Sequence, residues 1–300
     1  MRNIVIWFGA AVLLLSGCAQ ANKTEQITAT PEGIKGSVTL TKANGVKVHT
    51  YMAPVAFAGN TSHIIESDNA LMIVDTQMVV PFAKEVRAYA DSLGKPIERL
   101  IISHGHPDHW LGLDAGFADI PAYTLAETQG FLAKKGEMIR QQRQAKMGKM
   151  IASSFSAPQE IIKLGEAKFD GVNYIFERVV SAEADEQLII KLPEQKIIIV
   201  QDLVYTDVHL FIGQNHLNDW IAYLKKLQKE DYDIVLAGHG LPSDKAIYEQ
   251  NIEYLTFAQK AIESSSTPDM LKAKLLARFP NKGFHGIIDI SSSYLYGEGH

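Results

Sequence analysis

The chain has 300 residues, of which 46% are hydrophobic and 21% charged, so it has ample material for a globular core. Its net charge of -5 is mild and its basic residues are dispersed, which argues against a nucleic-acid partner. The single cysteine, Cys18, excludes a disulfide bond within the chain. The one basic cluster has helical spacing and is expected to form a solvated helix face: Arg140, Arg143, Lys146 and Lys149.

The N-terminal residues 1–18 have the pattern of an export signal. Arg2 supplies a positive charge, and the apolar run 4–15 is too short for a transmembrane helix. The sequence Leu-Ser-Gly-Cys, ending at Cys18, resembles the lipobox of bacterial lipoproteins, in which the cysteine is lipidated and becomes the mature N-terminus. The resemblance implies a lipidated Cys18, and the alternative is a plain cleaved signal peptide.

The residue after the cysteine is Ala19 rather than aspartate, which resembles the outer-membrane address of Gram-negative lipoproteins. We therefore expect a periplasm-facing protein that is held to the membrane by its N-terminal lipid. Residues 19–36 are rich in polar residues with Pro and Gly, and we expect them to form a flexible tether between the anchor and the folded domain.

The pattern becomes that of a β-structure from Gly45 onward. Residues 46–51 alternate like a half-buried strand, and residues 62–67 and 70–75 flank a short turn as a hairpin. Pro81 opens a predicted helix that runs to about residue 93. An apolar strand over residues 97–102 follows.

The second part of the chain repeats this mixture of strands and helices. We expect strands over 121–124, 172–180, 187–192, 196–200 and 234–237, and helices over 128–150, 219–229, 244–264 and 268–278. Asn218, Ser243 and Thr267 are the expected helix caps. No linker separates the two comparable parts, so the pattern predicts one α/β domain over residues 37–300, with two mixed sheets packed face to face and helices outside.

One short loop concentrates the metal-binding chemistry. Directly after the apolar run 100–102, the sequence His-Gly-His-Pro-Asp-His places His104, His106, Asp108 and His109 close together. Imidazole and carboxylate groups are ligands that Zn²⁺ and similar cations prefer. Four side chains at this spacing would strain a single site, so the loop suits two adjacent metals. The alternative is a polar surface loop that happens to be rich in histidine.

Two later residues follow buried strands in the same way. Asp202 comes after the apolar run 197–200, and His239 comes after the run 234–237. Strand ends are rigid supports that can hold metal ligands in register. Both side chains are therefore candidates for the same site.

Together these pieces resemble the metallo-β-lactamase-fold hydrolase superfamily, from about residue 45 to about residue 242. The resemblance rests on Asn60, Asp75, the loop 104–109, Asp202 and Gly238-His239-Gly240. It implies a four-layer αββα sandwich and a metal-dependent hydrolase. Zinc is the implied metal, as one or two ions, with manganese or iron as other options.

The resemblance also implies a role for each residue. His104 and His106 would bind the first metal, Asp108, His109 and His239 the second, and Asp202 would bridge both. A water or hydroxide between the metals would be the nucleophile, and Asp108 would handle its proton. Asp75 would position a ligand rather than bind metal, although a structural role is equally open.

One histidine of the family pattern is missing. Its position corresponds to Ala182, and no histidine lies between His109 and His209. We favour Glu183 as the replacement, because a carboxylate also binds such metals and because the setting resembles the alkylsulfatase branch of the superfamily. Glu186 is the alternative carboxylate. The first site could instead be weakened, or this acidic segment could be a solvated loop.

The expected function is hydrolysis of a small ester, lactone or β-lactam. The substrate class is not fixed by the fold, and a small-molecule partner is expected. A true β-lactamase is one alternative, and a non-catalytic lipoprotein that keeps the fold as a binding module is another. A weaker alternative is an oxidoreductase with a redox metal.

Overall fold

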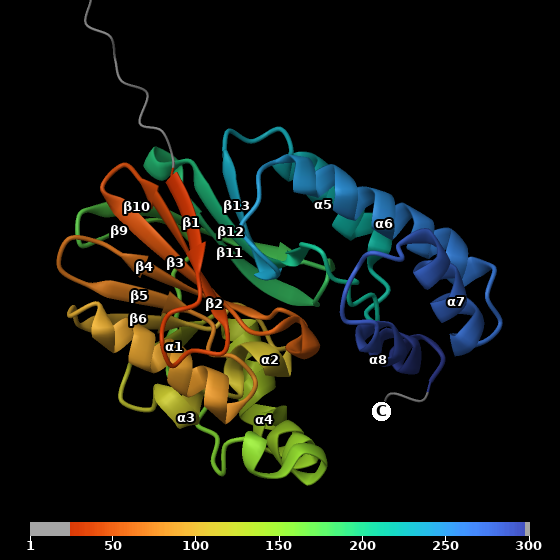
Figure 1. Ribbon diagram of the computed structural model, residues 1–300, viewed down its shortest axis with the longest axis horizontal. Coiled ribbons are helices and arrows are strands. Elements are labelled where there is room, and N and C mark those ends of the chain that lie inside the picture. Colours follow the sequence, from red (N-terminus) through yellow and green to blue (C-terminus); the bar gives the residue numbers. More distant parts are fainter. Residues whose placement is uncertain (1–24, 298–300) are drawn as a thin grey trace, which may run out of the picture.

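The computed structural model of the chain describes residues 25–297. Two β-sheets pack face to face and helices cover the outer face of each, which gives four layers (Figure 1). This arrangement confirms the expected αββα fold class. The predicted export signal and Cys18 lie outside the described residues. Among residues 25–297, no helix combines the length and the apolar character needed to cross a membrane.

The first sheet has eight strands, which lie in chain order. They are β1 (Glu25–Ala29), β2 (Ser37–Ala43), β3 (Val46–Met52), β4 (Thr61–Glu66), β5 (Leu71–Val74), β6 (Ile97–Ile101), β7 (Ala122–Thr124) and β8 (Glu160–Ile161). The first five strands are antiparallel, and the last four pair in parallel from β5 onward. The β4–β5 pair confirms the predicted hairpin.

The second sheet has five strands in the order β13, β12, β11, β10, β9. They are β9 (Gly165–Phe169), β10 (Val172–Val180), β11 (Glu186–Leu192), β12 (Ile197–Tyr205) and β13 (Ile234–His239). Only β12 and β13 are parallel. Their carboxyl ends therefore point the same way, and both deliver predicted site residues.

Helices close the two outer layers. They are α1 (Val80–Ser92), α2 (Pro107–Trp110), α3 (Leu113–Gly116), α4 (Ala126–Met147), α5 (Leu217–Leu227), α6 (Ala246–Glu263), α7 (Pro268–Arg278) and α8 (Gly286–Leu295). Short 3-10 turns lie at Val55–Phe57, Gly148–Met150 and Pro193–Gln195. Helices α1 and α3 pack on the first sheet, whereas α5 and α6 pack on the second (Figure 1).

The core between the sheets explains the continuous apolar runs of the central strands. Val74 and Ile101 of the first sheet meet Leu188, Ile199 and Leu236 of the second in one buried cluster. These strands are covered on both faces, by this cluster and by the outer helices, so they need apolar side chains in both directions. Each such side chain contributes about 1.5–3 kcal/mol by leaving water.

Several predicted boundaries are wrong. Residues 25–29, expected as part of the tether, pair with β2 as an edge strand. Strand β12 does not stop at residue 200 but continues through Asp202 to Tyr205, because a bulge at Gln201, where φ is 45°, lets polar residues stay in a buried strand. His239 is likewise the last residue of its strand.

The predicted helix caps are partly wrong. His216 and Lys245, rather than Asn218 and Ser243, precede α5 and α6, and neither makes a capping hydrogen bond. Thr267 is confirmed, since its side chain accepts a hydrogen bond from the Met270 N–H.

A polar network at the end of β4 makes the stability of the fold depend on pH. Glu66 accepts hydrogen bonds from Lys95 at 2.8 Å, from His49 at 2.9 Å and from Lys47 at 3.0 Å. Burial alone would raise the pKa of Glu66, but the three donors lower it to about 2.

We expect acid to weaken the fold through this carboxylate. Because the pKa of Glu66 is lower in the folded chain, its contribution is present above about pH 4.5 and is lost as the pH falls toward 2. Glu66→Gln should remove about 2 kcal/mol of unfolding free energy at neutral pH. In urea unfolding measured at a series of pH values, the variant should also lose less unfolding free energy than the wild type as the pH falls toward 2. Glu98→Gln, at an exposed position of β6, is the matched control and should leave this pH dependence unchanged.

Candidate metal centre

The predicted site residues converge at one edge of the two packed sheets, where short backbone pairings connect one sheet to the other. The Leu188 N–H donates to the Ser103 carbonyl at 2.9 Å, and the Gly240 N–H donates to the Gly59 carbonyl at 2.9 Å. The Asn60 side chain donates to the Asp108 carbonyl at 2.9 Å and so holds the histidine loop against this junction. Loops from one sheet and strand ends from the other therefore face each other across a short distance.

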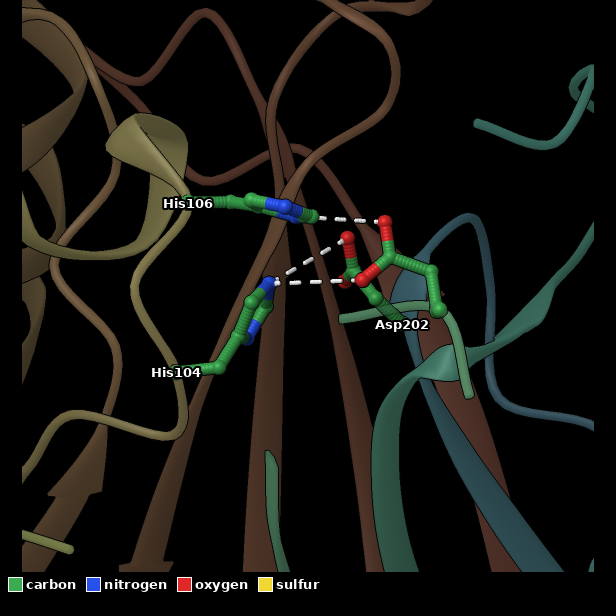
Figure 2. A group of neighbouring side chains, drawn as sticks. His104, His106 and Asp202 are labelled. Carbon is green, nitrogen blue, oxygen red and sulfur yellow. Dashed lines mark ion pairs between the residues drawn. The ribbon is translucent and has the colours of Figure 1, made fainter. Parts of the chain in front are cut away.

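One group of ligand atoms comes from three segments. His104 and His106 follow β6, Glu183 lies in the turn between β10 and β11, and Asp202 lies on β12. His106 Nδ1 is 3.1 Å from Glu183 Oε1, and His104 Nε2 is 3.7 Å from Glu183 Oε2 and 3.8 Å from Asp202 Oδ2. Figure 2 shows the two histidines on the opposite side of the site from Asp202, with His104 paired to the Asp202 carboxylate.

The second group shares Asp202 with the first. His109 Nε2 lies 3.2 Å from Asp202 Oδ1, and His239 Nε2 lies 3.2 Å from Asp202 Oδ2. Asp108 Oδ2 lies 3.6 Å from His109 Nε2 and 3.4 Å from His239 Nε2. Within each group the ligand atoms all lie within 4.8 Å of one another. This geometry matches the two ligand sets implied by the sequence.

Glu183, rather than Glu186, is the carboxylate at the centre. Glu183 is 1% exposed and faces both histidines, so the alternative of a solvated acidic loop is wrong for this residue. Glu186 instead pairs with Arg178 at 3.5 Å and belongs to neither ligand group. A buried carboxylate thus lies beside the two histidines of the first ligand group.

The donor atoms fit divalent cations. Four buried atoms that face the centre have no hydrogen-bond partner among the described residues: His104 Nε2, His109 Nε2, Glu183 Oε2 and Asp202 Oδ1. Burying such atoms without partners is costly, and buried charges are normally paired or bound to metal. Two metal ions that share Asp202 would satisfy all four.

The other ring nitrogens are already engaged, which fixes the tautomers. His109 Nδ1 donates to Asp75 Oδ2 at 2.7 Å, and His239 Nδ1 donates to the Ala58 carbonyl at 3.1 Å. The Ser103 hydroxyl donates to Asp75 at 2.7 Å, so it accepts from His104 Nδ1 at 2.9 Å. When the rings are neutral, each Nε2 carries the lone pair and points it at the centre.

Asp75 therefore positions two histidines without reaching the metal groups. It is fully buried and also accepts hydrogen bonds from the Ser103 N–H and the Gln201 amide. This is the arrangement expected of a residue that orients ligands from behind.

The charges of the two ligand groups favour replacement of the protons on their side chains by metal cations. Burial lowers the pKa of His239, but Asp202 and Asp108 together raise it to about 10. Burial raises the pKa of Asp202, yet His109 and His239 hold it well below its usual range. Because metal ligands must be deprotonated, a bound cation would take the place of these protons.

A glycine is required beside the shared carboxylate. A Cβ atom at Gly238 would lie 1.8 Å from Asp202 Oδ1. Strand β13 can pass the ligand this closely only without a side chain, which explains the Gly-His-Gly sequence around His239.

Sequence reasoning missed Tyr205. Its hydroxyl lies 2.9 Å from Asp202 Oδ2 and 3.2 Å from Glu183 Oε1, and its ring stacks on His239 with centroids 4.7 Å apart. In a regular strand, residues three apart lie on opposite faces. The irregular pairing of the strand between Gln201 and Tyr205 brings Asp202 and Tyr205 onto the same side. No feature of the sequence predicts this irregularity.

We expect Tyr205→Phe to weaken metal binding by about tenfold, because the hydroxyl holds two carboxylates of the first ligand group in place. Competition with a zinc chelator measures the affinity. Tyr254→Phe, which removes a buried hydroxyl bonded to His209, is the control and should leave zinc affinity unchanged. Equal affinity of the Tyr205→Phe protein and the wild type would contradict this role.

A family profile that matches most of the chain shows which family the protein belongs to. The family profile described as Metallo-beta-lactamase superfamily matches residues 56–239, a range that includes both ligand groups. The chain belongs to this superfamily. The expected enzyme class, a hydrolase of the metallo-beta-lactamase superfamily, is thereby confirmed.

Two curated relatives are named as sulfatases. The chain is 20% identical over 292 residues to alkyl/aryl-sulfatase BDS1 of Saccharomyces cerevisiae, with 78% of this chain and 45% of that protein covered. It is 24% identical over 217 residues to the linear primary-alkylsulfatase of a Pseudomonas species, with 60% and 41% covered. The chain thus spans less than half the length of these relatives.

Solved metallo-beta-lactamases share the fold. The enzyme from Pontibacter korlensis aligns with a TM-score of 0.58 at 17% identity, covering 73% of this chain and 99% of that one. The enzyme from Hirschia baltica aligns with a TM-score of 0.55 at 19% identity, covering 73% and 97%. At these identities the likeness establishes the fold alone.

The candidate metal centre opens into a cavity of about 300 Å³ with mainly apolar walls. Its lining combines site residues with apolar side chains, among them Phe57, Met78, Val79, Phe82 and Phe211. Trp110, the residue after the histidine loop, is fully buried and does not line the cavity, and its indole N–H donates to the Gly105 carbonyl. The cavity offers an organic group an apolar surface directly beside the metal ligands.

Proposed function

We propose that the protein is a two-metal hydrolase, with zinc as the preferred metal, that cleaves a small ester carrying an apolar organic group. The observation that carries the proposal is the pair of ligand groups that share Asp202 and line an apolar cavity. Sulfate esters rank first among the candidate esters, because both curated relatives are named as sulfatases and because the setting of Glu183, next to the family histidine position at Ala182, resembles that of the alkylsulfatase branch. The buried position of Glu183 removes the main reason for considering a non-catalytic binding module.

Each residue of the centre has a defined task in this proposal. His104, His106 and Glu183 would hold the first cation, and Asp108, His109 and His239 would hold the second, with Asp202 between them. When bound, the two cations would lower the pKa of a water molecule and polarise the scissile ester.

Asp108 is the residue placed to move a proton. Its side chain is 27% exposed and lines the cavity, whereas the other members of its ligand group are buried. Burial raises the pKa of Asp108, but His109 and His239 hold it below the usual range, so the group is a carboxylate at neutral pH. It can therefore accept a proton from an attacking water.

A hydrolysis panel with the purified protein tests this function. The substrates are an alkyl sulfate, a 4-nitrophenyl carboxylate ester, a lactone and a chromogenic cephalosporin. We expect turnover of an ester that is lost after chelation and returns with Zn²⁺ or Mn²⁺. Turnover of the cephalosporin alone would favour a β-lactamase, and no turnover of any substrate by metal-loaded protein would contradict the proposal.

We also propose that the protein is a lipoprotein that faces the periplasm from the outer membrane. The support is the sequence of residues 1–18, with its positive residue, short apolar run and lipobox-like end at Cys18. Metabolic labelling with a fatty-acid analogue should mark the wild type but not Cys18→Ser. Label in both proteins would contradict lipidation at this residue.

A further inference from the structure

The cavity above the metal centre has a wall that lies outside the family match. Phe284 and the α8 residues Ile287, Ile290 and Tyr294 line it, 45 residues or more beyond residue 239, where the match ends. The α8 residues are spaced by three and four positions, so they share one helix face. This face gives the cavity an extended apolar surface.

Helix α8 is held firmly enough to serve as a wall. Its opposite side is buried through Ile288, Ser291 and Ser292, and the Ser291 hydroxyl accepts a hydrogen bond from the Ile212 N–H at 3.0 Å. Lys272 of α7 pairs with Asp289 at 2.7 Å. The cavity-facing side chains Ile290 and Tyr294 nevertheless remain 37% and 43% exposed. Apolar side chains fixed in place but left open to solvent favour an apolar ligand.

A different helix contributes a cation to the same cavity. Arg143 and Met147, four residues apart on α4, are half-buried lining residues. The helices α4 and α8 are far apart in the sequence, and residues of both line the cavity. The expectation that the basic residues of this segment form a solvated face is therefore wrong for Arg140, which is buried, and for the half-buried Arg143.

The guanidinium of Arg143 is not engaged within the protein. The guanidinium of the nearby Arg140 donates hydrogen bonds to Glu137, Gln144 and the Ala152 carbonyl, so that group is already engaged within the protein. Arg143 makes no hydrogen bond or ion pair with any residue in the range 25–297. A permanently charged group with five donors, half-buried in an apolar cavity, favours an anionic partner.

We propose that Arg143 binds an anionic group of the substrate while the α8 face packs on its hydrocarbon part, so that the cavity selects amphipathic organic anions. The proposal rests on the proposed hydrolase function for its use in catalysis, but the binding itself does not depend on turnover. Charge-assisted hydrogen bonds to the guanidinium would set the orientation, and the apolar wall would add affinity that grows with chain length.

Calorimetric titration of zinc-loaded protein with octanoate, octyl sulfate and octanol tests the pairing. Arg143→Met should weaken binding of the anions by about tenfold or more and leave octanol binding unchanged. Arg143→Lys should retain much of the anion affinity. Lys146→Met, which removes an exposed cation from the same helix, is the matched control and should change none of the three affinities. The more strongly affected anion identifies whether carboxylate or sulfate is the preferred group.

The apolar wall is tested separately. Ile290→Ala should weaken octanoate and octanol alike, whereas Met270→Ala, at an exposed position of α7 away from the cavity, should weaken neither. An unchanged octanoate and octyl sulfate affinity in Arg143→Met, or an equal loss for octanol, would overturn the proposal. Octanoate and octanol have no bond to hydrolyse, so their result stands even if the hydrolysis panel fails.

Discussion

Replacement of Asp202 by asparagine is expected to abolish hydrolysis, with a loss on the order of 10⁴-fold or more in kcat/KM, about 5 kcal/mol of activation free energy. Asp202 is the only residue common to both ligand groups, and it lies within 3.2 Å of His109 and His239. An amide keeps the shape but cannot supply two anionic oxygens to two cations. Metal analysis of the purified variant should find both equivalents reduced.

Asp207→Asn is the control for this change. Asp207 follows the same strand but is exposed and lies outside both ligand groups, and asparagine tolerates its positive φ of 58°. It should keep full metal content and activity. If Asp202→Asn retained both metals and its activity, the assignment of a shared carboxylate would fail.

Replacement of Glu183 by glutamine should affect one metal and spare the other. Glu183 contacts His104 and His106 but belongs only to the first ligand group. We expect the metal content to fall from about two equivalents to about one, with a loss of activity on the order of 10²-fold or more. Dialysis against buffered zinc followed by elemental analysis measures the content.

Glu186→Gln supplies the matched control, since it removes a carboxylate three residues away that pairs with Arg178. It should retain both metals. Unchanged metal content in Glu183→Gln would mean that the first site is completed by another group.

The histidine loop could be predicted from the sequence because its chemistry is local. Within six residues it supplies four members of the centre, and the α2 turn that begins at Pro107 presents Asp108 and His109 together. Asp202 and His239 could be predicted from the buried strands that carry them. Their side chains act at the junction of two sheets, and the sheet pairing itself follows from long apolar runs.

Other parts of the site depend on contacts that leave no local signal. Tyr205 reaches the carboxylates only because β12 is irregular, and strand periodicity would place it on the other face. Arg143 has the spacing of a solvated helix residue, and only the tertiary fold places it in the lining of the same cavity as α8. The family resemblance ended before that helix and therefore could not predict the cavity wall.

The most direct test of the two-metal centre is anomalous diffraction at the zinc edge from crystals of the zinc-loaded protein. The predicted result is two peaks roughly 3.5–4 Å apart, both beside Asp202, with Glu183 within about 2.2 Å of one of them. A single peak, bound by Asp108, His109 and His239 with Glu183 turned away, would contradict the account.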